Sequence, residues 1–70
     1  MDKPSLYEIR VEGQLSDRWT DWFEGLAICQ EPNGETILRG LIRDQSALFG
    51  VLKKIQALNL VLIFVARISP

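Results

Sequence analysis

The stretch DQSALFGVLKKIQALNLVLIFVARI, residues 44–68, decides the fold class, because its apolar residues change from the spacing of a helix to that of a strand. Its first part predicts one amphipathic helix with an apolar residue at every third or fourth position. These residues are Leu48, Val51, Leu52, Ile55 and Leu58. Asp44 is predicted to cap the start of the helix and Asn59 to end it. Gly50, in the middle, either allows a close approach to the sheet or is merely tolerated.

The second part, LVLIFVARI at residues 60–68, predicts a strand that is apolar on both faces as far as Arg67. A strand of this kind normally lies at the centre of a sheet or is covered on both sides. One main helix can cover only one face of a sheet. The sequence therefore predicts that the second face is buried in some other way.

Three further strands are predicted before the helix. Residues 6–15 alternate between apolar and polar side chains, which indicates a strand with one buried face. Residues 23–30 and 36–42 read as strands on either side of Pro32-Asn33-Gly34. Asn and Gly tolerate the positive φ of a tight turn, so this pair of strands is expected to form a hairpin.

Residues 16–23, SDRWTDWF, allow two interpretations. With Ser16 as N-cap, a helical turn would place Trp19, Trp22 and Phe23 on one side, and the fold would be a reduced ferredoxin-like β-α-β-β-α-β arrangement. Alternatively, the segment is a wide turn and the order is β-β-β-α-β. About ten residues barely suffice for a parallel crossover, so we predict the second order. The predicted fold is α+β, a four-stranded mainly antiparallel sheet with one main amphipathic helix on one face.

The 70 residues allow one small domain, residues 1–70, whose core is marginal for stability. A single cysteine excludes a disulfide within the chain, and the lack of histidine removes the commonest zinc ligand sets. The net charge of −1 gives no general attraction to nucleic acid or acidic membranes. No signal peptide or membrane-spanning run is visible, so a cytoplasmic location is expected.

Charge is unevenly distributed along the chain. Residues 1–35 carry eight acidic and three basic residues, whereas residues 36–70 carry one acidic and five basic residues. This asymmetry predicts either salt bridges between neighbouring elements or head-to-tail association of copies.

No catalytic, cofactor-binding or metal-binding residue is predicted, and the chain is not expected to be an enzyme. Cys29 lies on a strand with no base near it in sequence, which favours a packed thiol. Asp17, Asp21 and Glu24 lack the glycine-turned loop of a calcium site and are interpreted as the acids of a helical turn. Phosphate-binding glycine patterns are absent, and the basic residues are too few to favour nucleic acid.

Two sets of apolar residues are candidates for an interface. The first is Trp19, Trp22 and Phe23, because Trp is enriched at interfaces, although aromatic residues at this spacing are more often core. The second is the predicted sheet face away from the helix, with Phe23, Ala27, Cys29, Ile37, Leu41, Val61, Ile63 and Val65. Monomers rarely expose such a patch, so we expect it to be covered by the Trp segment and the N-terminal arm, or by oligomerisation.

The pattern YEIRVEGQL…WTDWFEGLAI, followed by DQSALFGVLKKIQALNL, resembles a group of short bacterial proteins. Members of that group share the first strand, a W-x-x-W-F segment and a D-Q-x-A-L helix start. The resemblance extends from Tyr7 to Ile68 and implies a stand-alone bacterial domain. It implies no activity and no functional residues.

Three functions agree with these observations. The first is a non-catalytic interaction module that acts as a homo-oligomer, with a dimer favoured. The second is an adaptor or regulatory protein that docks a partner protein through the Trp segment. The third is a small-molecule-binding subunit with a pocket between sheet and helix, near Tyr7 and Arg10 or Arg39.

Overall fold

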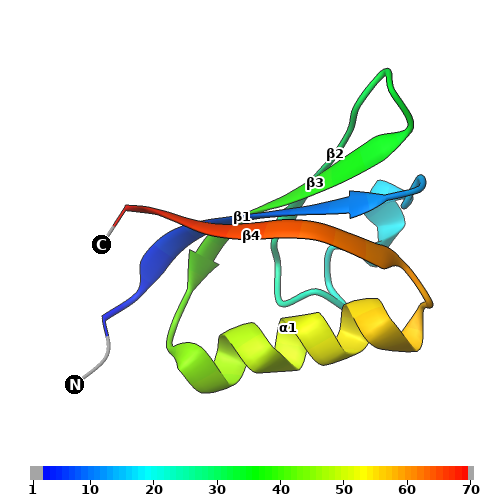
Figure 1. Cartoon of the computed structure of the whole chain (residues 1–70). Helices are drawn as coiled ribbons and strands as arrows, with labels where there is room; N and C mark the ends of the chain where they lie inside the picture. Colours follow the sequence, from blue (N-terminus) through cyan, green and yellow to red (C-terminus); the bar gives the residue numbers. More distant parts are fainter. Residues whose placement is uncertain (1–2, 70) are drawn as a thin grey trace.

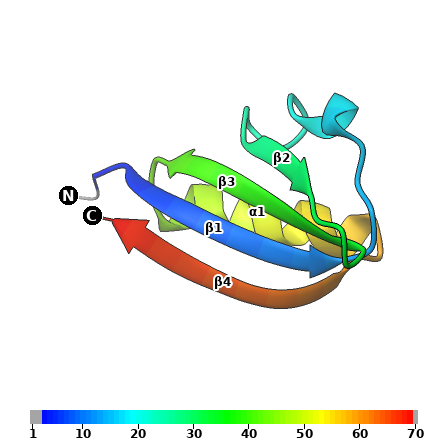
Figure 2. The ribbon, with the colours of Figure 1, turned by 90° about the horizontal axis from the view of Figure 1, so that it is seen from above.

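The computed structural model describes residues 3–69, which form one antiparallel sheet and one α-helix (Figure 1). The elements in chain order are β1 (Ser5–Glu12), the 3₁₀ helix η1 (Asp17–Trp19), β2 (Ala27–Gln30), β3 (Glu35–Ile42), α1 (Gln45–Ala57) and β4 (Val61–Ser69). The strands lie in the order β2-β3-β1-β4, with α1 across one face (Figure 2). The predicted α+β class and the β-β-β-α-β order are confirmed. Residues 16–23 contribute only the short η1, so the ferredoxin-like alternative is wrong.

Strand β1 is a central strand, paired with β3 on one side and with β4 on the other. Its alternating sequence directs every second side chain towards α1, and two of them, Ile9 and Val11, are fully buried. The other strands and the helix complete the core with Leu38 and Ile42, with Phe23 and Leu26, and with Leu48, Val51 and Ile55. The helix stripe predicted from spacing therefore forms the contact between helix and sheet.

The end of β1 is fixed by one buried hydroxyl group. Thr36 donates a hydrogen bond to the carbonyl of Gly13 at 2.7 Å and accepts one from the amide of Leu15 at 3.1 Å. Gly13 has a φ of 103°, so the chain turns there instead of continuing as a strand to Leu15. Leu15 is nevertheless buried, because the turn returns it to the core.

Strand β2 is shorter than predicted. Residues 23–26 form a turn in which Glu24 and Gly25 have φ values of 62° and 81°, and this conformation is incompatible with a strand. The turn inserts Phe23 and Leu26 into the core. The hairpin that follows has its turn at the predicted position, with Gly34 at a φ of 89°.

The ends of α1 are those that the sequence predicts. The Asp44 carboxylate accepts a hydrogen bond from the amide of Ala47 at 2.8 Å, and Asn59 has a φ of 59° just beyond the helix. A Cβ at Gly50 would meet no atom within 4 Å, so this glycine is tolerated and serves no close packing. No helix between residues 3 and 69 has the length and apolar character that a bilayer crossing requires.

Strand β4 lies at the edge of the sheet, next to β1 alone. Of the two placements expected for a strand that is apolar on both faces, the centre of the sheet is therefore wrong. At the C-terminal end of β4, Ser69 pairs with Leu6, so the first and last strands lie side by side (Figure 2). Its edge position leaves an apolar strand with a free side.

Some of the acidic residues of the first half of the chain form ion pairs with basic residues of the second half. Two ion pairs join the acidic and the basic halves of the chain: Arg39 Nε lies 3.9 Å from Glu8 Oε1, and Lys54 Nζ lies 2.6 Å from Glu24 Oε2. These contacts agree with the interpretation that the halves supply salt bridges to each other.

Two glycine substitutions test the packing of the core. A Cβ at Gly40 would lie 2.9 Å from Leu26 Cδ2, and Leu26 is buried. We expect Gly40→Ala to lower the free energy of unfolding by about 1–2 kcal/mol, because Leu26 must move. We expect the control Gly50→Ala to raise it by about 0.5–1 kcal/mol, because alanine favours the helix and meets nothing.

Urea denaturation of both variants and the parent, at one protein concentration, measures these changes. Equal or greater stability of Gly40→Ala would contradict the close contact between Leu26 and β3.

Candidate functional site

Strand β4 carries five of the eight exposed large apolar side chains of the described chain, and its free side with these side chains is called here the β4 edge. Its large exposed side chains, with their exposed fractions, are Val61 (58%), Leu62 (45%), Ile63 (40%), Phe64 (39%) and Ile68 (47%). The strand is nine residues long, and within residues 3–69 no other strand pairs with its outer side. A long apolar edge of this kind offers unpaired backbone groups to another strand.

Two irregularities change the direction of the side chains of β4. The register with β1 shifts by one residue between Arg10 and Val11, and again between Leu6 and Tyr7. As a result Val65 pairs with Ile9 on the helix side, whereas Phe64 pairs with Arg10 on the outer face.

The β4 shifts and the turn at residues 23–26 correct two assignments of the predicted outer face. Val65 is half-buried and packs against the core, so it lies on the helix side. Phe23 is fully buried in the core and offers no surface to a partner. The remaining candidates are accessible: Leu41 is 69% exposed, Ile37 is half-buried, and Val61 and Ile63 belong to the β4 edge.

The middle of the outer face is charged. Arg10 Nη1 lies 3.1 Å from Glu35 Oε1, and Arg10 Nη2 lies 3.8 Å from Glu8 Oε2. Arg39 extends this group by its contact with Glu8. The apolar residues of the face are therefore divided, with Leu41 on the β3 side and Phe64 on the β4 side of the charges.

Arg10 also contacts the β4 edge directly. Its guanidinium carbon lies 5.3 Å from the centroid of the Phe64 ring, within the range of a cation–π contact. Its Nε is buried without a hydrogen-bond partner among the described residues. Arg10 thus links β1, β3 and β4 on the face that no helix covers.

The three aromatic residues of the Trp segment have different environments. Trp22 packs edge-on against Trp19, at 5.4 Å between ring centroids, and against the buried Phe23, at 5.0 Å. Trp22 is half-buried, and Trp19 is 37% exposed. Of the three predicted contact residues, Trp19 is the most exposed.

Lys54 attaches the Trp segment to α1. Its Nζ donates hydrogen bonds to the Trp22 carbonyl at 2.7 Å and to Glu24 at 2.6 Å, and it lies 5.7 Å from the Trp22 ring centroid. The hydrogen bond from Lys54, together with its positive charge, lowers the pKa of Glu24. Glu24 therefore serves as the partner of Lys54.

The acidic residues of this segment do not converge. Nowhere in residues 3–69 do three His, Cys, Asp or Glu side chains lie together in a way that could hold a metal ion. Asp17 begins η1, where Ser16 caps the turn by accepting a hydrogen bond from the Arg18 amide. Ser16 and Asp17 therefore occupy the N-terminus of a short 3₁₀ turn, whereas Asp21 and Glu24 lie beyond it, so the interpretation as acids of a helical turn holds for Asp17 alone.

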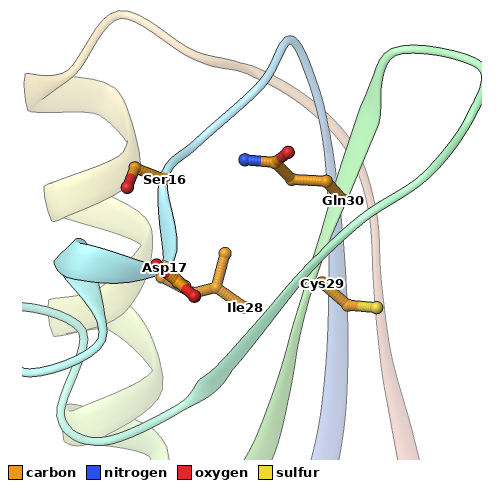
Figure 3. A pocket seen from close by; sticks show the side chains of 5 residues that line it. All are labelled: Ser16, Asp17, Ile28, Cys29 and Gln30. Atoms are coloured by element: carbon orange, nitrogen blue, oxygen red, sulfur yellow. The ribbon is translucent and has the colours of Figure 1, made fainter.

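A shallow depression of about 390 Å³ lies between η1 and β2 (Figure 3). Ser16, Asp17, Ile28, Cys29 and Gln30 line it. Ile28 and Gln30 point towards Ser16 and Asp17, whereas the Cys29 sulfur points to the other side of the strand. Gln30 Nε2 already donates to the Leu15 carbonyl at 2.9 Å. The depression thus offers a few oxygen atoms and no basic group.

Two expectations from the sequence are wrong: that the Cys29 thiol is packed in the core, and that Tyr7 lies near Arg10 or Arg39 at one pocket. Cys29 is exposed on the edge strand β2, not packed in the core. Tyr7 lies on the helix side, where its hydroxyl accepts a hydrogen bond from Gln45, whereas Arg10 and Arg39 lie on the outer face. Tyr7 and these arginines therefore do not line one pocket.

Sequence reasoning missed four exposed apolar residues. Leu62, Phe64 and Ile68 were not among the predicted interface residues. The first register shift moves Phe64 to the outer face, whereas Leu62 stays opposite Val11 and is exposed because β4 is an edge strand. Phe49 is 57% exposed on α1. A signal for Phe49 was present, because it falls outside the helical spacing of the apolar stripe.

Comparisons with known proteins agree with the resemblance at the level of the family. No match was found among curated proteins, and none among solved structures. One family model, described as Domain of unknown function (DUF8691), matches residues 6–66. The match includes all of α1, β2 and β3 and most of β1 and β4. The chain therefore belongs to the DUF8691 family.

Proposed function

We propose that this chain is a non-catalytic protein-interaction module that acts as a homo-oligomer, with a dimer favoured. The observation that carries the proposal is the β4 edge, where five large apolar side chains are exposed along one strand. Monomers seldom leave a patch of this kind in contact with water.

The size of the domain supports the same proposal. The helix covers one face of the sheet, and in a chain of 70 residues a single core gives little stability. Burial of the β4 edge in a second copy would add apolar contacts that one chain lacks. The free, exposed thiol of Cys29 suits a reducing compartment, so we place the module in the cytoplasm.

Light scattering after size exclusion, over a series of micromolar dilutions, tests the oligomer. We expect a mass above that of the 8.0 kDa chain, decreasing towards it on dilution. The mass of a single chain at every concentration would contradict the proposal.

A pair of substitutions locates the surface responsible. We expect Ile63→Lys to shift the protein to the mass of one chain and to lower the melting temperature at concentrations where the parent is associated. The control Phe49→Lys also places a charge at an exposed apolar site, on α1, and should leave the mass unchanged. An unchanged mass for Ile63→Lys would exclude the β4 edge.

The exposed ring of Trp19 favours a second candidate function, that of an adaptor for another protein. We expect Trp19→Ala to lose partners that the parent captures from a bacterial lysate while its melting temperature changes little. Trp22→Ala is less suitable, because Trp22 packs on the buried Phe23 and its loss disturbs the core. Identical partner lists for the parent and Trp19→Ala would remove the Trp segment from consideration.

A further inference from the structure

We propose that the homo-oligomer forms by antiparallel pairing of β4 with the β4 strand of a second copy, so that two four-stranded sheets become one continuous sheet. This inference rests on the proposed function and adds the strand that makes the contact and its direction. Contact through the outer sheet face is the alternative that the experiment must distinguish.

The two edges of the sheet differ in their capacity for pairing. The β2 edge is four residues long, and η1 with its charged residues packs beside it (Figure 2). The β4 edge is nine residues long and free. Because only β4 is available, pairing uses the same strand in both copies and closes at two chains instead of continuing into a filament.

The first part of β4 lacks the side chains that normally protect an edge. Proteins place lysine, proline or inward-pointing charges on edge strands to prevent pairing. Residues 61–66 contain none of these, and the one charge of the strand, Arg67, pairs with Tyr7 on the helix side near the end of the strand. The two register shifts do bend β4, and the first lies at Ile63, but residues 61–62 and 64–67 on its two sides stay in regular register with β1. In an antiparallel ladder centred on Ile63, the section before Ile63 in one copy pairs with the section after it in the other.

The side chains of β4 indicate what kind of strand fits beside it. Phe64 makes the outer face of this edge apolar, and Val65 makes the helix side apolar. β1, which alternates, already pairs with the inner side of β4, so the outer side does not exclude an alternating strand. A second copy of β4, which is apolar on both faces through residues 61–66, would bury more apolar surface there.

The position of Arg67 favours the antiparallel direction. In a parallel pair in register, the two Arg67 residues would be directly adjacent at about 5 Å, and like charges in that position are destabilising. In an antiparallel pair centred on residues 61–65, they lie more than about 10 Å apart. The apolar side chains then meet in the middle of the ladder.

Cross-linking through single cysteines distinguishes these arrangements. In the Cys29→Ser background, Ile63→Cys, Leu41→Cys and Ser69→Cys are each treated with a short bismaleimide at a concentration where the parent is associated. We expect Ile63→Cys to give a covalent dimer, because Ile63 lies near the centre of the ladder. We expect Leu41→Cys, on the outer face of β3, and Ser69→Cys, at the end of β4, to remain single chains.

Hydrogen exchange supplies an independent readout. Those amides of residues 61–65 that point away from β1 should exchange at least about tenfold more slowly in the associated protein than after dilution. The amides of β2 serve as the control, and their exchange should not depend on concentration.

The outcomes separate the two proposals. If light scattering shows a dimer but Leu41→Cys cross-links in place of Ile63→Cys, the homo-oligomer stands and pairing through β4 is overturned. Cross-linking of Ser69→Cys together with Ile63→Cys would overturn the antiparallel direction. A single-chain mass at every concentration would overturn both this inference and the proposed function.

Discussion

The structure depends on the pairing of β1 with a strand on each side. This pairing places Ile9 and Val11 in the centre of the molecule, fully buried beneath α1. β3 and β4 occupy the two neighbouring positions, so β2 is left to the far side of β3 and β4 to the opposite edge. A single helix can then cover the central strands of one face, and the capping by Asp44 fixes where that helix begins.

The two faces of the sheet differ in the side chains that they present. The helix side buries apolar residues, whereas the outer side has a group of paired charges around Arg10. Paired charges remain compatible with water, and apolar side chains of this face such as Leu41 and Phe64 lie on either side of them. Most of the exposed large apolar side chains lie on β4, at the edge of the sheet, which also has unpaired backbone groups.

Local features of the fold could be predicted from sequence, and long-range features could not. The helix from Asp44 to Asn59 follows from spacing and capping, and the turn at Gly34 follows from the residues that tolerate positive φ. The position of β4 could not be derived in this way. A strand that is apolar on both faces fits the centre of a sheet as well as an edge, and strand order depends on pairings between distant residues.

The candidate surface could be predicted only in part, because it also depends on pairings between distant residues. Val61 and Ile63 were identified, but the irregularities of β4 move Val65 to the core and Phe64 to the outer face. Such irregularities arise from the fit between two strands and leave no mark in the sequence of one strand. In the Trp segment, spacing grouped three aromatic residues correctly, yet the turn at Glu24 and Gly25 sends Phe23 inward and leaves Trp19 outside.

The pairing of the first strand with the last has a consequence for folding kinetics. The ladder between β1 and β4 joins residues from opposite ends of the sequence, and such a high contact order slows folding through the entropy of closing a long loop. The hairpin of β2 and β3 and the helix form from local contacts, so β4 is expected to dock late. Until it docks, one side of β1 is exposed, and the β4 strand of another molecule can occupy it. Protein concentration during refolding should therefore determine the yield of correctly closed chains.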